Sequence, residues 1–531
     1  MTTNRRLSVL LVAALASACA STVPRTQFPA PPDVDQVAQV AVLSVEVTPA
    51  SAVVTVARVG APPRVRPARA DGFVVEEFVP GVYEVTAAAP GYITSEPRIV
   101  TMTAGARSTI QIDLAAVPVV GRRGPVRRQG HAYADDDGPW LSSGTTLFWA
   151  LWGEKFAPEK LEQNLAFVAK PRFGQRPVDY IRVLSMVGAA SWEERVIDPR
   201  WPDYWQIVDR LVARAARHGL RLQVTVFADA QVMMPGASDR DAWADAWSAR
   251  VSRQPEMFTA IEAANEAWQN GFDDTADLAR ITKRINDRTQ VLTAPSATGC
   301  GSHPEDPKTS EQRACVDEWR QLAAVSDLMT PHFDRNVGMA DGYDRPIRQP
   351  WEMLFGPREL GVETYINNEP IGPQSSVASD GDPRRLAMAA ATTWLTQGAA
   401  YTLHTGAGIR GGSAFDLLRG RSANIWEVPQ IDQILDEIAK AKAALPANLP
   451  NCRPANAHWA EAPFSVDPNA LTRAYQSVCD DGTFVVLPHG IRGGSVDLVA
   501  RRAVVVDGVA IPSGGVLTVQ GPSAIIVGKV R

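Results

Sequence analysis

The sequence predicts an α/β protein in which a (β/α)8 barrel lies between two β-sandwich domains. The chain has 531 residues. A single hydrophobic core rarely supports a chain of this length, so two to four domains are expected. Between about residue 145 and residue 445, short β-branched apolar runs alternate with amphipathic segments, which is the period and size of such a barrel. On either side, short alternating runs are separated by turn residues, which indicates β-sandwiches.

The N-terminus has the features of an export signal. Arg5 and Arg6 precede the apolar run 7–15, and Ala16-Ser17-Ala18-Cys19 follows. We therefore expect residues 1–19 to be a secretory signal, because the apolar run is too short to remain as a membrane-spanning helix. This stretch resembles a bacterial lipoprotein box, and Cys19 occupies the position of the cysteine that is lipidated in such a box. The protein is expected to be an outer-membrane or cell-surface lipoprotein, with plain secretion or a periplasmic location as the alternative.

Four further cysteines agree with export. Cys300 and Cys315 are neighbours in sequence, as are Cys452 and Cys479. In an oxidising compartment, these two pairs are the natural disulfides. A zinc site is disfavoured because the chain has no Cys-x-x-Cys spacing.

The region before the barrel divides into three parts. Residues 20–39 are rich in Pro, Ala and Thr and are typical of a linker. Residues 40–117 predict a small β-sandwich, and the stretch from Pro80-Gly81 through Pro90-Gly91-Tyr92 resembles the PEGA-type and prealbumin-like modules of exported bacterial enzymes. Residues 118–140 contain Arg122-Arg123 and Arg127-Arg128 and are interpreted as a solvated connector.

The barrel is expected over residues 141–447, followed by the C-terminal sandwich over 448–531. A doubly wound open sheet is the alternative, but no Gly-rich phosphate turn follows the first strand. The predicted strands are 146–152, 179–186, 221–227, 258–264, 290–293, 327–331, 362–367 and 400–405, and the predicted helices include 158–169, 204–218, 311–324, 383–396 and 428–445.

Two carboxylates stand directly after predicted strands. The fourth strand is followed by Asn265-Glu266-Ala267, and the seventh by Asn368-Glu369-Pro370. In a barrel of this kind, the residues after the strands build the active site. Glu266 and Glu369 would then face each other across the mouth, as glycoside hydrolysis requires of its acid and its ionised carboxylate. Glu262 and Glu363 lie earlier in the same strands and are expected to form interior or bottom-face ion pairs.

On these motifs, residues from about 129 to 445 resemble the clan of retaining glycosidases that includes the family 5 cellulases and mannanases. The resemblance implies that Glu266 is the acid/base, Asn265 binds the sugar 2-hydroxyl and Glu369 is the nucleophile. It also implies that Arg182, near the end of the second strand, supports Glu369. The chain departs from the pattern in two places: Ala267 replaces the usual Pro, and His404 lies where a Trp is common. The second departure leaves the sugar open.

Four more side chains are candidates for the site. His332 follows the sixth strand, and a His or Tyr there commonly contacts the nucleophile in the clan. His404 follows the eighth strand and is a candidate sugar contact. Trp152 and Trp268 stand at predicted strand ends, where an aromatic face suits the C–H face of a pyranose. The histidines come from different loops without ligand spacing, so neither a metal nor any other cofactor is expected.

The composition agrees with the predicted glycosidase function. The net charge of −5 disfavours nucleic-acid binding, and a carbohydrate is the expected partner. Contact with a membrane is expected only through a lipid at Cys19. Two rival functions remain: a polysaccharide-binding lipoprotein without turnover, against which intact Glu266 and Glu369 argue, and a transglycosylase of envelope glycans, which would keep the same residues. A Ser-His-Asp hydrolase is excluded for want of Gly-x-Ser-x-Gly.

Overall fold

A computed structural model gives the fold of most of the chain beyond residue 39. The expected signal, the linker, Cys19, Cys300 and Glu363 lie outside the described residues. Described are 40–50, 52–58, 64–68, 72–89, 92, 94–114, 121–188, 195–296, 310–333, 345–352, 364–375, 379–406, 422–456, 460–467, 472–490, 494–519 and 525–531.

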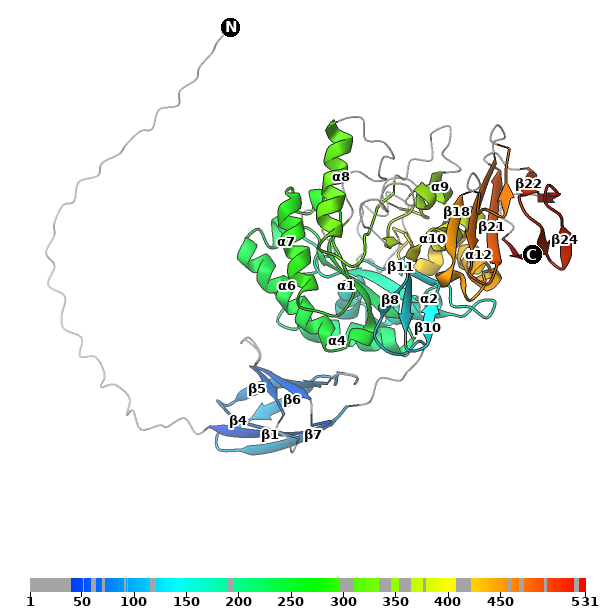
Figure 1. The fold of residues 1–531 in the computed structure, drawn as a ribbon. Helices are drawn as coiled ribbons and strands as arrows, with labels where there is room; N and C mark the ends of the chain where they lie inside the picture. The colour runs from blue at the N-terminus through cyan, green and yellow to red at the C-terminus, as the bar shows by residue number, and fades with distance from the viewer. Residues whose placement is uncertain are drawn as a thin grey trace, which may run out of the picture.

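A seven-stranded parallel sheet forms the centre of the molecule (Figure 1). Its strand order is β15-β14-β13-β12-β11-β17-β16, so each strand pairs with the next along the chain except β15 with β16, and the first strand, β11, also pairs with the last, β17. The strands are β11 (Ser142–Thr146), β12 (Tyr180–Leu184), β13 (Arg221–Phe227), β14 (Phe258–Ala264), β15 (Thr293–Ala294), β16 (Tyr365–Asn367) and β17 (Gly398–Leu403).

The gap between β15 and β16 is bridged by the segment around Met329. Leu328 N donates to Thr293 O at 3.2 Å, and Ile366 N donates to Met329 O at 2.8 Å. Met329 also forms a parallel bridge with Tyr365. This segment is the predicted sixth strand, reduced to a bridge. The curled parallel sheet therefore fits a (β/α)8 barrel.

Helices follow the strands as the sequence predicts. In α4, the residues spaced by three and four positions, such as Ile207 and Leu211, are buried. Asp382 caps α10 by accepting from the N–H groups of Arg384 and Arg385, and Pro383 occupies the first turn. The helices are α1 (Ala150–Phe156), α2 (Pro158–Ala169), α4 (Tyr204–Arg217), α5 (Ala230–Met233), α6 (Ala237–Ser252), α7 (Thr275–Asn286), α8 (Ser310–Ala323), α9 (Arg345–Glu352), α10 (Pro383–Leu395) and α12 (Ile431–Ala444).

The first barrel strand lies earlier than predicted. It ends at Thr146, and the apolar run that follows continues into helix α1, which contains Trp152. The prediction of a strand over 146–152 was therefore wrong, because a short apolar run fits a buried helix as well as a buried strand. Packing explains the glycine in β11: a Cβ at Gly144 would lie 2.3 Å from the Tyr180 ring.

The described part of the basic connector folds against the barrel instead of forming an open linker. It forms a three-stranded sheet of β8 (Arg127–Gln129), β9 (Ala132–Asp135) and β10 (Gly138–Trp140). Buried Asp135 pairs with Arg122 and with Arg221 of β13. Tyr133 packs in a cluster with residues from five barrel strands, among them Tyr180 and Ala260. Arg122, Arg123 and Arg127 thus each have an aspartate partner nearby, which the one-dimensional charge pattern did not reveal.

Each flanking region contains two sheets that share one hydrophobic cluster, the arrangement expected of a β-sandwich. The N-terminal sheets have the orders β4-β1-β7 and β3-β2-β5-β6, and the C-terminal ones β18-β20-β21-β26-β23-β24 and β19-β22-β25. Resemblance of the first to a PEGA-type module stays a prediction. The strands are β1 (Ala41–Thr48), β2 (Val53–Arg58), β3 (Arg64–Pro67), β4 (Phe73–Phe78), β5 (Gly81–Ala88), β6 (Arg98–Met102), β7 (Arg107–Asp113), β18 (Arg453–Asn456), β19 (Phe464–Ser465), β20 (Thr472–Val478), β21 (Thr483–Gly490), β22 (Val496–Ala500), β23 (Val504–Val506), β24 (Val509–Ile511), β25 (Val516–Val519) and β26 (Ile526–Val530).

The C-terminal region packs directly on the barrel. Ser477 Oγ of β20 donates to Leu395 O at the end of α10, and residues of β20 and β21 belong to the barrel's own core cluster. The Cys452–Cys479 disulfide is present, which confirms that predicted pair, whereas the Cys300–Cys315 pair stays a prediction. Within the described ranges, none of the helices has the length and apolarity to cross a membrane.

We predict that the Tyr133 ring seals the end of the barrel opposite the strand carboxyl ends. Tyr133→Ala should lower the free energy of unfolding by about 3–5 kcal/mol, because it leaves a cavity in a fully buried cluster, and denaturant unfolding measures this. Tyr133→Phe is the matched control. It should cost little, since among the described residues the phenol oxygen has no hydrogen-bond partner. Equal losses in both variants would contradict the role of the ring.

Candidate active site

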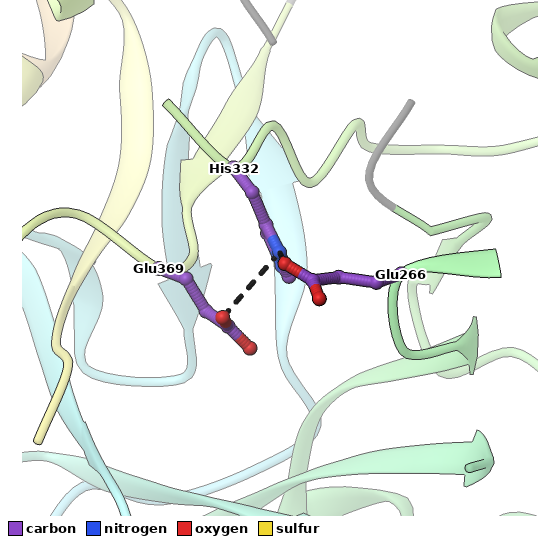
Figure 2. Close-up of side chains that lie close together, drawn as sticks. All are labelled: Glu266, His332 and Glu369. Atoms are coloured by element: carbon purple, nitrogen blue, oxygen red, sulfur yellow. Dashed lines mark hydrogen bonds and ion pairs between the residues drawn. The ribbon is translucent and has the colours of Figure 1, made fainter. Parts of the chain in front are cut away.

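Glu266 and Glu369 meet at one end of the barrel, as the strand-end argument predicts. Glu266 lies two residues after β14, and Glu369 lies two residues after β16. Figure 2 shows the two side chains entering from different loops and converging on the ring of His332. One oxygen of each carboxylate and one ring nitrogen of His332 all lie within 4.8 Å of one another. Glu369 is buried, while Glu266 is partly exposed.

Arg182 is the cation of the site and is completely buried. Its Nη1 donates to Glu369 Oε1. Its Nε and Nη2 both donate to Glu262 Oε2, at 3.0 and 2.7 Å, and Nη2 also reaches Asn265 Oδ1 at 3.0 Å. Burial opposes the charge of the guanidinium, but the carboxylates of Glu262 and Glu369 outweigh that effect, so the pKa of Arg182 is raised. Arg182 is thus a permanent cation shared by two carboxylates.

Glu262 lies inside the barrel and belongs to the same network, which confirms its predicted interior ion pair. In addition to Arg182, its Oε2 accepts from Thr225 Oγ1 at 2.6 Å, and its Oε1 accepts from Asn368 Nδ2 at 2.8 Å. Four donors therefore surround this carboxylate, which is what a buried charge requires.

His332 links the two candidate catalytic carboxylates. Its Nδ1 lies 3.1 Å from Glu266 Oε1 and 3.4 Å from Glu369 Oε2. Its Nε2 lies 3.4 Å from Asn368 Nδ2. The ring is buried, and it stands directly after the bridge residues around Met329 that close the sheet. The segment at the sixth barrel position therefore places His332 between Glu266, which follows the fourth strand, and Glu369, which follows the seventh.

The backbone at Glu266 has an unusual conformation, with φ of 35° and ψ of 70°. A non-glycine residue in this left-handed region is strained and needs support from its surroundings. The Asn270 side chain gives that support by donating to Asn265 O at 2.5 Å and to Glu266 O at 3.2 Å. Asn270 Oδ1 accepts in turn from Asp229 N at 2.7 Å. The loop that carries Glu266 is therefore fixed to the end of β13.

Two residues that the sequence analysis did not single out, Asn270 and Asn368, thus hold the site together. Asn368 could have been suspected, because it directly precedes Glu369 in the polar run that ends its strand. Asn270 follows Glu266 by four residues in a loop, and no periodicity distinguishes it from any other loop asparagine.

The remaining candidates differ in their positions. His404 is buried, and its Nε2 lies 3.8 Å from Glu369 Oε2. Phe148 packs near both His404 and Arg182. Its ring centre lies 5.8 Å from the ring centre of His404 and 5.1 Å from Arg182 Cζ. Trp268, in the short helix Ala267–Gln269 directly after Glu266, is 41% exposed. Trp152 is not at a strand end: it lies within α1 and packs on Phe156 at 5.4 Å.

The cluster of Glu266, His332 and Glu369 also has the spacing of a metal-ligand set. The donor set fits a hard cation such as Ca²⁺ or Mg²⁺ poorly. Arg182 already balances charge at Glu369, and hard oxygen-binding cations prefer several more oxygen ligands than this cluster supplies. The expectation that no metal takes part stays a prediction.

Arg182 should be worth more to stability than any surface ion pair of the barrel. Arg182→Met is expected to destabilise the fold by about 3–5 kcal/mol, because two buried carboxylates lose their cation. Adding Glu262→Gln should recover part of the loss, since one of the stranded charges is then removed. Denaturant unfolding of both variants and of Glu262→Gln measures the coupling.

The matched control is Arg320→Met, which breaks the exposed pair of Arg320 with Asp317 and should leave the unfolding midpoint unchanged. An Arg182→Met midpoint equal to that of the control, or strictly additive effects in the double variant, would show that the buried network is not coupled.

Comparison with known proteins finds no matching family model and no matching curated protein. Among solved structures, the chain is similar to a glycoside hydrolase family 5 protein from Bacteroides vulgatus, with 12% identity, a TM-score of 0.48 and coverage of 77% of this chain and 93% of that one. It is also similar to a family 5 mannosidase from Rhizomucor miehei (10%, 0.43, 61% and 99%) and to an endo-1,4-β-D-mannanase from Thermotoga petrophila (14%, 0.41, 56% and 99%). These likenesses are too distant to assign this chain an activity.

Proposed function

We propose that the protein is a retaining glycoside hydrolase that cleaves O-glycosidic bonds of a poly- or oligosaccharide, with Glu369 as nucleophile and Glu266 as acid/base. The observation that carries the proposal is the pair itself: one oxygen of each carboxylate, from separate strand ends, lies within 4.8 Å of the other. Retaining enzymes hold their carboxyls about 5–5.5 Å apart, whereas inverting ones leave roughly 6.5–9.5 Å for a water molecule. The short separation supports the retaining mechanism.

The surroundings of the two carboxylates suit their separate roles. Glu369 is buried against the guanidinium of Arg182, which favours its ionised form and orients one oxygen, leaving the other for the anomeric carbon. Glu266 faces neutral amide and imidazole groups: its Oε2 accepts from Gln269 Nε2 at 3.1 Å, and its Oε1 lies 3.1 Å from His332 Nδ1. Glu266 is also the more exposed of the two, as a group that exchanges its proton with a leaving alcohol and then with water should be.

The reaction then has two steps. Glu369 attacks the anomeric carbon while Glu266 donates its proton to the leaving oxygen, so that the C–O bond to the leaving group breaks and a glycosyl ester forms. Glu266, now ionised, takes a proton from water. The resulting hydroxide equivalent attacks the ester and releases both the sugar and Glu369. No cofactor is required by this chemistry.

Two side chains next to Glu266 are placed to bind the sugar. Asn265 Oδ1 is engaged by Arg182, so its Nδ2 is the atom available to donate to a sugar hydroxyl. Trp268 offers an exposed aromatic face beside the acid/base. His404, close to Glu369, is a further candidate contact. Trp152 is a weaker candidate than its predicted strand-end position suggested, because α1 holds it against Phe156.

We further propose that the enzyme acts outside the cytoplasm, anchored through Cys19 or released. The Cys452–Cys479 disulfide supports this location, because structural disulfides form in oxidising compartments. A transglycosylase would use the same two carboxylates and pass the glycosyl group to a sugar instead of water. Product analysis with and without an acceptor sugar distinguishes the two activities.

Glu369→Gln should abolish turnover of any glycan that the wild type cleaves in a polysaccharide panel, since the amide cannot form the glycosyl ester. Glu266→Gln should lower kcat/KM by about 10²–10⁴-fold, the usual contribution of an acid/base group. Glu437→Gln, on helix α12, is the control and should retain full activity. Unchanged cleavage by either site variant would refute the proposed mechanism, and a wild type without activity on any glycan would favour the binding-protein alternative.

The stereochemistry of the first product is a separate test. NMR of the sugar released in the first minutes should show the anomeric configuration of the substrate, because two displacements restore it. Release of the opposite anomer would mean single displacement by water. It would exclude Glu369 as a nucleophile even if its replacement abolishes activity.

A further inference from the structure

A chain of hydrogen bonds runs from the interior of the barrel to the candidate catalytic pair through Asn368. The Asn368 Nδ2 atom lies 2.8 Å from Glu262 Oε1 and 3.4 Å from His332 Nε2. Its Oδ1 accepts from Gln223 Nε2 at 2.7 Å. All four side chains are buried, so water does not readily substitute for any of these partners.

Glu262 determines which way the Asn368 amide points. Arg182 donates to Glu262 through two nitrogen atoms, and a carboxylate held in such an ion pair can only accept hydrogen bonds. The Asn368 atom that faces Glu262 must therefore be the NH2 group. Flipping Asn368 and Gln223 together would preserve the bond between them, but it would set the Asn368 oxygen against the carboxylate. The ion pair thus fixes the amide.

The fixed amide in turn fixes the ring of His332. Because an N–H group of Asn368 faces Nε2, that nitrogen has to accept and cannot carry a proton. A neutral imidazole bears one proton, which then lies on Nδ1. Nδ1 is the atom that faces Glu266 Oε1 and Glu369 Oε2 (Figure 2). A doubly protonated ring would oppose two N–H groups across the Asn368 contact, so this arrangement disfavours it.

We propose that Glu262 is a positioning residue of the site: through Asn368 it keeps His332 as a neutral ring whose Nδ1 proton points at the two candidate catalytic carboxylates. This rests on the proposed function for its role in turnover but not for its geometry. His332 then donates a hydrogen bond to the pair without adding a full positive charge beside Arg182. Glu266 remains the group that carries the transferred proton.

The test is the tautomer of His332, read from long-range ¹H–¹⁵N NMR spectra of the full-length protein with ¹⁵N-labelled histidine. The spectrum of His332→Gln assigns the signal. In the wild type, Nδ1 should be protonated and Nε2 bare. Titratable or charged groups around the ring come from four strands, and the spectra are recorded over a pH range to follow them together: Glu266, Glu369, Glu262, Arg182 and His404.

The decisive variant exchanges the two ends of the Glu262–Asn368 hydrogen bond. Glu262→Gln combined with Asn368→Asp keeps the bond and the total charge, but it turns an acceptor toward His332 Nε2. The ring proton should then move to Nε2, and kcat/KM should fall by on the order of tenfold or more as the donor to the pair is lost. Thr225→Val is the matched control: it removes a different hydrogen bond of Glu262 and should leave the tautomer unchanged.

A wild-type ring protonated on Nε2, or a tautomer that the exchange leaves unchanged in a folded double variant, would overturn the inference. If the double variant does not fold, the wild-type spectrum alone decides. This outcome is distinguishable from failure of the proposed function. An active Glu369→Gln variant would remove the glycosidase mechanism while leaving the NMR assignment intact. An inactive Glu369→Gln variant together with a His332 ring protonated on Nε2 would remove only the role of Glu262.

Discussion

The buried guanidinium of Arg182 is the interaction on which the site depends. Glu262 and Glu369 both lie inside a protein interior, where an uncompensated charge is costly. Arg182 compensates both because its planar fork offers separate N–H groups to each, with Asn265 on a third side. A lysine could not divide its contacts in this geometry. The ends of β12, β14 and β16 are thereby held in one arrangement.

The barrel makes this arrangement possible in two ways. Parallel strands end at the same rim, so residues far apart in the chain, such as Arg182, Glu266, His332 and Glu369, come together without a long loop. The opposite end is covered by the sheet of β8, β9 and β10, with Tyr133 in the interior. Exclusion of water from beneath the site strengthens every hydrogen bond and ion pair within it.

Polarity as well as position is transmitted from the interior to the rim. Arg182 makes Glu262 an acceptor, Glu262 makes Asn368 a donor, and Asn368 makes His332 Nε2 an acceptor. Each step follows from the permanent charge of an arginine and the fixed donors of an amide. The proposed chemistry needs one protonated and one ionised carboxylate side by side, and a neutral donor between them is compatible with both states. The strained backbone of Glu266, supported by Asn270, belongs to the same preorganised arrangement.

The sequence by itself determined which residues could meet at the rim. Apolar runs ended in polar residues at a regular spacing, so strand counting selected Glu266 and Glu369, and the resemblance to retaining glycosidases added Arg182 and His332. The runs 221–227 and 258–264 were predicted to the residue. Tertiary structure decided what the pattern leaves ambiguous. An apolar run such as 147–152 satisfies a strand or a buried helix equally, and only packing placed Trp152 in α1. The basic stretch 121–128 resembles a linker in sequence, but in the structure the carboxylates of Asp135 and Asp137 pair with its arginines. The roles of Asn270, Asn368 and Glu262 arise from hydrogen bonds between distant segments, and such bonds leave no periodic trace in a single sequence.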